Sequence, residues 1–150
     1  MPRLASPPAV RQSHEDGCGP ACAEMLLRDR GFEVAQVGIA EGMALPATAE
    51  CLAARMGEVS PTTWLGAFAA LDGGPSWAFV AGLTAERGSW AALLEPLGFR
   101  HPGHWVVVDG VSDDGVVWIR DPVGQHYGTP IEEFLELWHY TMMVIEEGSQ

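Results

Sequence analysis

Apolar side chains recur along the chain with two different spacings, and the change in spacing separates predicted helices from predicted strands. An apolar stripe that returns every three to four residues is typical of an amphipathic helix. The first such segment covers about 19–30, with Pro20 in its first turn and Gly31 as its stop signal. The same spacing predicts further helices at 47–56, 61–71, 89–97 and 130–137.

Short apolar runs predict the strands. The clearest two cover 104–108 and 116–119, and they flank Ser112-Asp113-Asp114-Gly115, a sequence typical of a hairpin turn. Two further runs, 77–80 and 139–145, predict one strand each. Because the helices mostly precede the strands, we expect an α+β fold rather than a parallel sheet. One domain is expected over residues 12–150, preceded by a Pro-rich, flexible arm over residues 1–11.

Composition and charge narrow the class of protein. The chain has 150 residues and is 47% hydrophobic, which is typical of a packed domain and not of a disordered acidic tail. Twenty acidic side chains stand against eight arginines and no lysine, so the formal net charge is −12. This charge repels phosphate backbones and argues against nucleic-acid binding. It favours a basic peptide or protein as partner.

The sequence shows neither a membrane span nor an export signal. No apolar run approaches the roughly 18 residues that a membrane-spanning helix needs. The Pro-rich start also lacks the apolar stretch of a secretory signal. We therefore expect a soluble chain, cytoplasmic as given or secreted as the effector domain of a longer protein.

Three cysteines form an odd and sparse set, which argues against a disulfide framework. Cys18 and Cys22 would share one face of the first helix, but no second pair with the spacing of metal ligands follows them. Asp113 and Asp114 lack the further oxygen ligands of a calcium site and are expected to form a solvated turn. The sequence therefore predicts no metal site and no cofactor.

Cys18 stands where a cysteine can be reactive. It falls at the start of the first predicted helix, where free N–H groups and the positive end of the helix dipole stabilise a thiolate. Gly17 and Gly19 leave the backbone around its sulfur open to a substrate carbonyl. Cys22 lies one turn further along the apolar stripe and is expected in the core.

A nucleophilic cysteine needs a base and a group that orients the base. His104 begins one hairpin strand, and Asp121 follows the other. If the hairpin pivots near Ser112-Asp113, residues 104 and 121 lie opposite each other with their side chains on one face. Asp121 would then fix the imidazole tautomer and stabilise the imidazolium. A one-residue slip in register would separate the two side chains.

Each of these residues also has an ordinary structural explanation. Cys18 alone fits a small core residue, His104 a hydrogen-bonded strand histidine, and Asp121 a turn residue before proline. His101 is a rival base, but His104 is favoured because it begins the apolar strand. His14 is expected to be exposed. Only the ordered set of residue types favours catalysis.

Three motifs in order resemble a known family. Gln12 precedes Gly17-Cys18-Gly19-Pro20-Ala21-Cys22, and the segments 103–110 and Arg120-Asp121-Pro122 follow. This series resembles the bacteriocin-processing peptidases, which are papain-fold cysteine peptidases that are usually fused to ABC exporters and remove leader peptides after a double glycine. The resemblance covers about residues 12–145. It implies that the helix carrying the cysteine packs against a C-terminal antiparallel sheet.

The resemblance also implies a role for each site residue. Cys18 would be the nucleophile, His104 the base and acid, and Asp121 the group that orients the imidazole. Gln12 lies six residues before Cys18, the offset at which papain-like peptidases place their oxyanion-hole glutamine. Its amide and the N–H of Cys18 would hold the developing oxyanion.

Three functions are compatible with these residues. The first is a cysteine peptidase that hydrolyses peptide bonds through a Cys-His-Asp triad, with leader-peptide processing as one form. Stand-alone papain-fold domains, including secreted bacterial effectors and toxin domains, suggest the second: a deamidase or acyltransferase that acts on a protein target and has an immunity or partner protein. The third is a non-catalytic peptide-binding module, which the presence of all four catalytic residue types disfavours.

Overall fold

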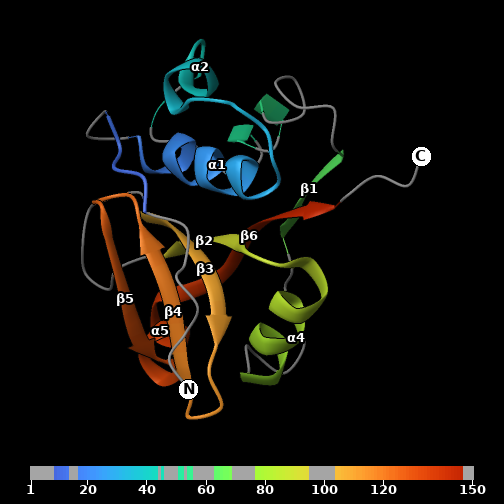
Figure 1. Cartoon of the computed structure of the whole chain (residues 1–150). Coiled ribbons are helices and arrows are strands. Elements are labelled where there is room, and N and C mark those ends of the chain that lie inside the picture. The colour runs from blue at the N-terminus through green and yellow to red at the C-terminus, as the bar shows by residue number, and fades with distance from the viewer. Residues whose placement is uncertain are drawn as a thin grey trace.

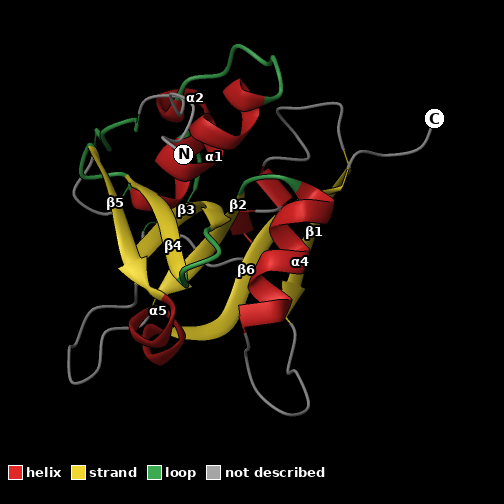
Figure 2. Ribbon diagram, turned by 60° about the horizontal axis from the view of Figure 1, so that its bottom comes forward, coloured by secondary structure: helices red, strands yellow, loops and turns green. Residues whose placement is uncertain are grey.

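A six-stranded antiparallel sheet with helices on both faces forms the body of the molecule (Figures 1 and 2). The computed structural model describes residues 9–13, 17–43, 45, 51–52, 54–55, 63–68, 77–94 and 104–146. The helices are α1 (Cys18–Asp29), α2 (Gln36–Ala40), α4 (Trp77–Arg87) and α5 (Ile131–Leu137), and residues 51–52 and 54–55 are also helical. The strands are β1 (Thr63–Phe68), β2 (Trp90–Leu94), β3 (His104–Val111), β4 (Val116–Asp121), β5 (Gln125–Pro130) and β6 (Trp138–Glu146).

The strands lie in the order β1-β6-β2-β3-β4-β5, and each neighbouring pair is antiparallel. Helix α1 lies on one face of this sheet, with α2 on the far side of α1 (Figure 1). Helices α4 and α5 pack against the opposite face. The predicted α+β class is confirmed, with the cysteine-bearing helix on an antiparallel sheet. The predictions of α1, the β3–β4 hairpin, α5 and β6 are confirmed as well.

Three predicted elements are wrong. Within the expected helix at 89–97, residues 90–94 form strand β2 and residues 95–97 lie outside the described residues, and the expected strand at 77–80 is the first turn of α4. Within the expected helix at 61–71, residues 63–68 form β1, and the remainder lies outside the described residues. Strand β2 is central and buried on both faces, so its apolar residues do not alternate with polar ones and mimic a helical stripe.

Two elements have no counterpart among the predictions. Strand β5 is at the edge of the sheet, and its residues are mostly exposed and polar. Helix α2 has only five residues, too few to show a helical period. Both elements contribute side chains to the region around Cys18.

Consecutive residues of β3 alternate between two apolar clusters, one on each face of the sheet. Trp105 and Val107 pack with Cys22, Met25 and other α1 residues. On the other face the cluster contains buried residues from four strands and two helices: Val80, Trp90, Ala92, Leu94, Val106, Val108, Val117, Ile119, Ile131, Phe134 and Trp138. Burial of both clusters removes apolar surface from water. The cluster on the α1 side also fixes α1 against the start of β3.

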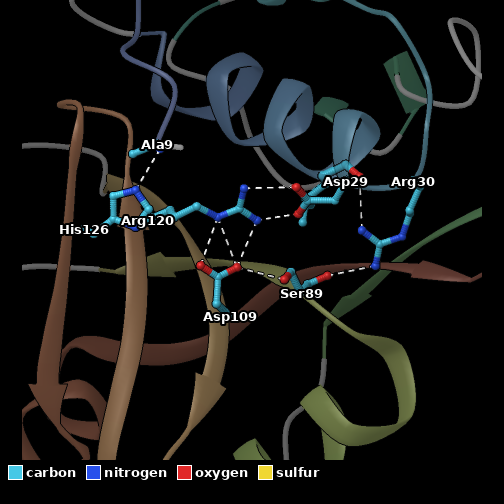
Figure 3. A network of polar contacts seen from close by, with 8 residues as sticks. Ala9, Asp29, Arg30, Ser89, Asp109, Arg120 and His126 are labelled. Atoms are coloured by element: carbon cyan, nitrogen blue, oxygen red, sulfur yellow. Dashed lines mark hydrogen bonds and ion pairs between the residues drawn. The ribbon is translucent and has the colours of Figure 1, made fainter. Parts of the chain in front are cut away.

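A buried arginine joins the end of α1 to the β3–β4 hairpin (Figure 3). Arg120 of β4 is 1% exposed. Its Nε donates to Asp109 Oδ2 at 2.9 Å, and its Nη1 donates to Asp29 Oδ1 at 3.1 Å. Asp109 also accepts a hydrogen bond from Ser89 Oγ at 2.8 Å, and Arg30 donates to the carbonyl oxygen of Ser89 at 3.0 Å. One guanidinium therefore neutralises a carboxylate from α1 and one from β3.

Replacing Arg120 by methionine is expected to lower the free energy of unfolding by about 3–5 kcal/mol, because two carboxylates would lose their buried counter-charge. Arg120→Lys keeps the charge but not the fork of donors, so its loss should be smaller. Adding Asp29→Asn and Asp109→Asn to Arg120→Met should recover part of the stability. Urea unfolding at neutral pH measures all three. A loss below about 1 kcal/mol in Arg120→Met, the value of a surface ion pair, would contradict this account.

Candidate active site

Cys18 is the first residue of α1, and its residue surface is 5% exposed. No side chain caps this helix, and no acidic residue lies in its first turn. The positive end of the helix dipole is therefore not neutralised by a carboxylate of that turn. The backbone N–H of Trp105 donates to Cys18 Sγ at 3.4 Å. The sulfur therefore lies between the N-terminus of α1 and the first residues of β3.

His104 and Asp121 are in direct contact. His104 Nε2 lies 2.7 Å from Asp121 Oδ1. The carboxylate also accepts hydrogen bonds from the Tyr127 hydroxyl to Oδ2 at 2.6 Å and from the Val123 N–H to Oδ1 at 3.0 Å. Asp121 begins a turn as well, because its carbonyl accepts from the N–H of Gly124 at 2.8 Å. The two explanations of Asp121, turn residue and partner of His104, both hold.

The hairpin reaches this geometry through a register that differs from the predicted one. Near the site, Val107 pairs with Arg120, a register that sets Asp121 opposite Val106 and not opposite His104. The predicted pairing is therefore wrong by two residues, but an even offset keeps both side chains on one face. The register shifts by one residue between Val108 and Gly110, which makes Asp109 a bulge. Without this bulge, the register at the turn would put Asp121 on the opposite face from His104.

Charges inside the site determine the protonation of the histidine. Burial alone would lower the pKa of His104, but the hydrogen bonds and charges of Asp121 and Cys18 outweigh it and raise this pKa from 6.5 to about 9. Burial would raise the pKa of Asp121, but hydrogen bonds from His104 and Tyr127 outweigh it and lower that pKa. At neutral pH the pair is an imidazolium and a carboxylate.

The second cysteine of the helix behaves differently. Cys22 is 0% exposed and belongs to the apolar cluster, so its prediction as a core residue is confirmed. Burial, followed by the charges of Cys18 and Asp121, raises the pKa of the Cys22 thiol well above its ordinary value. This thiol stays protonated at neutral pH.

The segment with Gln12 runs beside the turn that follows Asp121. The N–H of Gln12 donates to the carbonyl oxygen of Pro122 at 2.6 Å. Two residues of the predicted N-terminal arm also contact the domain, since Val10 packs on the α1 cluster and Ala9 N–H donates to His126 Nε2 at 3.1 Å (Figure 3). The structure thus brings the Gln12 backbone to the edge of the site.

Tyr127 and Gln36 are site residues that the sequence reasoning missed. Tyr127 belongs to β5, which was not predicted, and it lies opposite Ile119 of β4. The Pro122–Gly124 turn was a usable signal, because a second hairpin there would bring residue 127 back beside β4. Gln36 belongs to α2 and offered no such signal. His14 and His101 lie outside the described residues.

The described part of the chain contains neither a cluster of metal ligands nor a membrane-spanning helix. Its His, Cys, Asp and Glu side chains form no group of three or more that is arranged to hold a metal ion. None of its helices combines the length and the apolar character needed to cross a membrane.

Known proteins match both the sequence and the fold. The model of the Peptidase_C39 like family matches residues 5–144. Cysteine protease effector 1 of Escherichia coli O1:K1:H7 is 35% identical over 131 residues, which are 87% of this chain and 25% of that protein. The chain thus spans about a quarter of the length of this relative.

Solved structures show the same fold at low identity. The peptidase domain of Streptococcus ComA, a bi-functional ABC transporter, matches with a TM-score of 0.75 at 16% identity, covering 94% of this chain and 98% of that one. A putative C39-like peptidase from Bacillus anthracis matches with 0.77 at 15%, covering 95% and 96%. A double glycine motif protease from an AMS/PCAT transporter, solved with its leader peptide, matches with 0.70 at 15%, covering 94% and 91%.

The fold and the family match define the class as papain-like cysteine peptidases of the C39 type. The chain belongs to the Peptidase_C39 like family.

The charge on His104 predicts how the site responds to pH. In Asp121→Asn the pKa of His104 should fall well below about 9, because the charge of Asp121 is lost while burial still lowers this pKa. Tyr127→Phe keeps the carboxylate and should shift this pKa less. NMR titration of the His104 imidazole measures both values. An unchanged His104 pKa in Asp121→Asn would contradict the assignment.

The same raised pKa links folding to pH. The stabilisation from charged His104 is complete below about pH 6.5 and is lost as the pH rises through about 9. The free energy of unfolding, measured in urea across this window, should therefore fall in the wild type. It should fall less in Asp121→Asn.

Proposed function

We propose that this chain is a peptidase domain in which Cys18, His104 and Asp121 act as a catalytic triad and Gln12 completes the oxyanion hole. The observation that carries the proposal is the contact of three elements at one point. The N-terminus of α1 brings Cys18 Sγ to the backbone N–H next to His104, and His104 is held by Asp121 at 2.7 Å. Thiol, imidazole and carboxylate at such contacts are the parts that nucleophilic catalysis needs.

The geometry supports a definite role for each imidazole nitrogen. Because Asp121 engages Nε2, Nδ1 is the nitrogen available to serve Cys18. The Cys18 thiolate attacks the peptide carbonyl carbon and forms a C–S bond, while the amide of Gln12 and the N–H of Cys18 hold the oxyanion. His104 then donates its proton to the leaving amine as the C–N bond breaks.

Water completes the cycle. His104, now neutral, takes a proton from a water molecule, and the resulting hydroxide adds to the thioester carbonyl. Collapse of this second tetrahedral intermediate breaks the C–S bond, releases the carboxylic acid product and restores the thiolate–imidazolium pair. Asp121 stays ionised throughout and stabilises each imidazolium.

A protein target is the substrate class that we favour, with this domain acting as part of a longer, secreted effector. The support is the 35% identity to a protein named a cysteine protease effector, of which this chain matches a quarter. Leader-peptide cleavage is the narrower alternative, suggested by structures only 15–16% identical. The net charge of −12 favours a basic region in the substrate or in an immunity or partner protein.

Replacing Cys18 by alanine should abolish peptide hydrolysis and alkylation at this site. The readouts are cleavage of internally quenched peptides, including one with a Gly-Gly bond, and iodoacetamide labelling at neutral pH. Cys51 is an exposed cysteine, so labelling needs a Cys51→Ser background. Cys22→Ala is the matched control and should keep turnover, because its thiol is buried away from solvent. Unchanged hydrolysis in Cys18→Ala would overturn the proposal.

The same chemistry of thiol, imidazole and carboxylate also serves deamidation or acyl transfer on a protein target, which is the second candidate function. Mass spectrometry of candidate proteins treated with the enzyme separates the outcomes. Peptidase activity shortens the chain, whereas deamidation adds about 1 Da at a glutamine or asparagine. We expect cleavage. A binding module without catalysis would leave the proteins unchanged, and its Cys18 would react no faster than free cysteine.

A further inference from the structure

Gln36 holds the backbone on both sides of Gln12. Its Nε2 donates to the carbonyl oxygen of Arg11 at 2.7 Å, and its Oε1 accepts from the N–H of Ser13 at 2.9 Å. Gln36 is 8% exposed. One side-chain amide thus forms two hydrogen bonds to the residues that flank Gln12.

These bonds follow the pattern of a strand pair. In an extended chain, the carbonyl of residue 11 and the N–H of residue 13 point to one side, and the N–H of residue 12 points to the other. Gln36 satisfies the first side, and the carbonyl of Pro122 satisfies the second at 2.6 Å. The Gln12 backbone is therefore held from both sides, so it can turn neither toward nor away from the site without breaking hydrogen bonds.

Gln36 is in turn fixed to the helix that carries Cys18. Its backbone N–H, at the start of α2, donates to Glu24 Oε1 at 2.7 Å. Glu24 belongs to α1 and is 5% exposed, and Arg28 lies 3.6 Å from its other oxygen. A continuous path of contacts thus joins α1 through Glu24 and Gln36 to the Gln12 segment.

We propose that Gln36 is a positioning residue, whose side-chain amide sets the place of Gln12 relative to Cys18 and so aligns the oxyanion hole. This inference rests on the proposed function of Gln12 as an oxyanion donor. Gln36 itself touches no reacting atom. Its effect should therefore appear in turnover and disappear when the Gln12 side chain is absent.

The test is a double-mutant cycle on Gln12 and Gln36, measured with the internally quenched peptides. Gln12→Ala should lower kcat by about 10²–10³. Gln36→Met, which keeps the length of the side chain and removes both polar groups, should lower kcat by about 10–100-fold with KM nearly unchanged. The double variant should be no slower than Gln12→Ala alone, since each loss acts through the same donor.

Two controls separate positioning from general damage. Alkylation of Cys18 by iodoacetamide develops no oxyanion, so its rate in the Cys51→Ser background should be unchanged by Gln36→Met. Val37→Ala changes the next residue of α2, which is 68% exposed, and should keep full turnover. If Gln36→Met does not fold, Gln36→Glu serves instead. It keeps the acceptor for Ser13, replaces the donor to Arg11, and should show the same pattern.

The outcomes are distinct. Equal kcat losses from Gln36→Met with and without the Gln12 side chain would overturn the positioning role, as would wild-type turnover in Gln36→Met. Full turnover in Gln12→Ala would instead remove the proposed role of Gln12 and this inference with it. Failure of Cys18→Ala to stop hydrolysis would reject the triad itself.

Discussion

The position of the site depends on the buried ion pairs of Arg120, because they fix the helix that carries the thiol against the hairpin that carries the imidazole. Asp29 lies at the end of α1, Asp109 lies in β3, and the guanidinium that joins them stands one residue before Asp121 (Figure 3). The planar guanidinium group holds its N–H donors in a fixed fork, so it can bind two carboxylates at once. An ammonium group lacks this geometry. Any shift of α1 along the sheet would separate buried charges, and this cost opposes the shift.

Asp109 serves the site in a second way through its place in the chain. It is the bulged residue of β3, and the one-residue shift there brings His104 and Asp121 to the same face of the hairpin. The bulge also offers the Asp109 carboxylate to Arg120 on the α1 face. One irregularity in the sheet therefore supplies both the register that brings His104 to Asp121 and an anchor for the helix that carries Cys18.

Local sequence signals correctly predicted the elements whose residue patterns are typical of their structure. They failed where burial on both faces, or pairing with a distant strand, determines the structure. Helix α1 shows a stripe with a proline start and a glycine stop, and the β3–β4 hairpin shows its turn residues. Strand β2 is buried on both faces and was mistaken for a helix, because its pattern carries no alternation.

The residues of the candidate site likewise fall into those that the sequence predicts and those that it does not. Cys18, His104 and Asp121 could be named from residue types and order, but their contact depends on a bulge that no local pattern announces. Tyr127 contacts Asp121 only because β5 pairs with β4. Gln36 meets residues 11 and 13 only because α2 folds back on α1. The Pro122–Gly124 turn was a sequence signal for the Tyr127 contact, whereas the contacts of Gln36 leave no spacing in the chain that predicts them.

The two cysteines of α1 have different electrostatic surroundings because they lie at different positions along the helix. Cys18 and Cys22 are one turn apart on the same face, and both are largely buried. The first has the helix N-terminus and the N–H of Trp105 beside its sulfur, and its charge contributes to the raised pKa of His104. The second sits in the apolar cluster, where burial and the negative charges of Cys18 and Asp121 oppose its ionisation. Negative charge at position 18 therefore favours the imidazolium of His104 and disfavours ionisation of the Cys22 thiol.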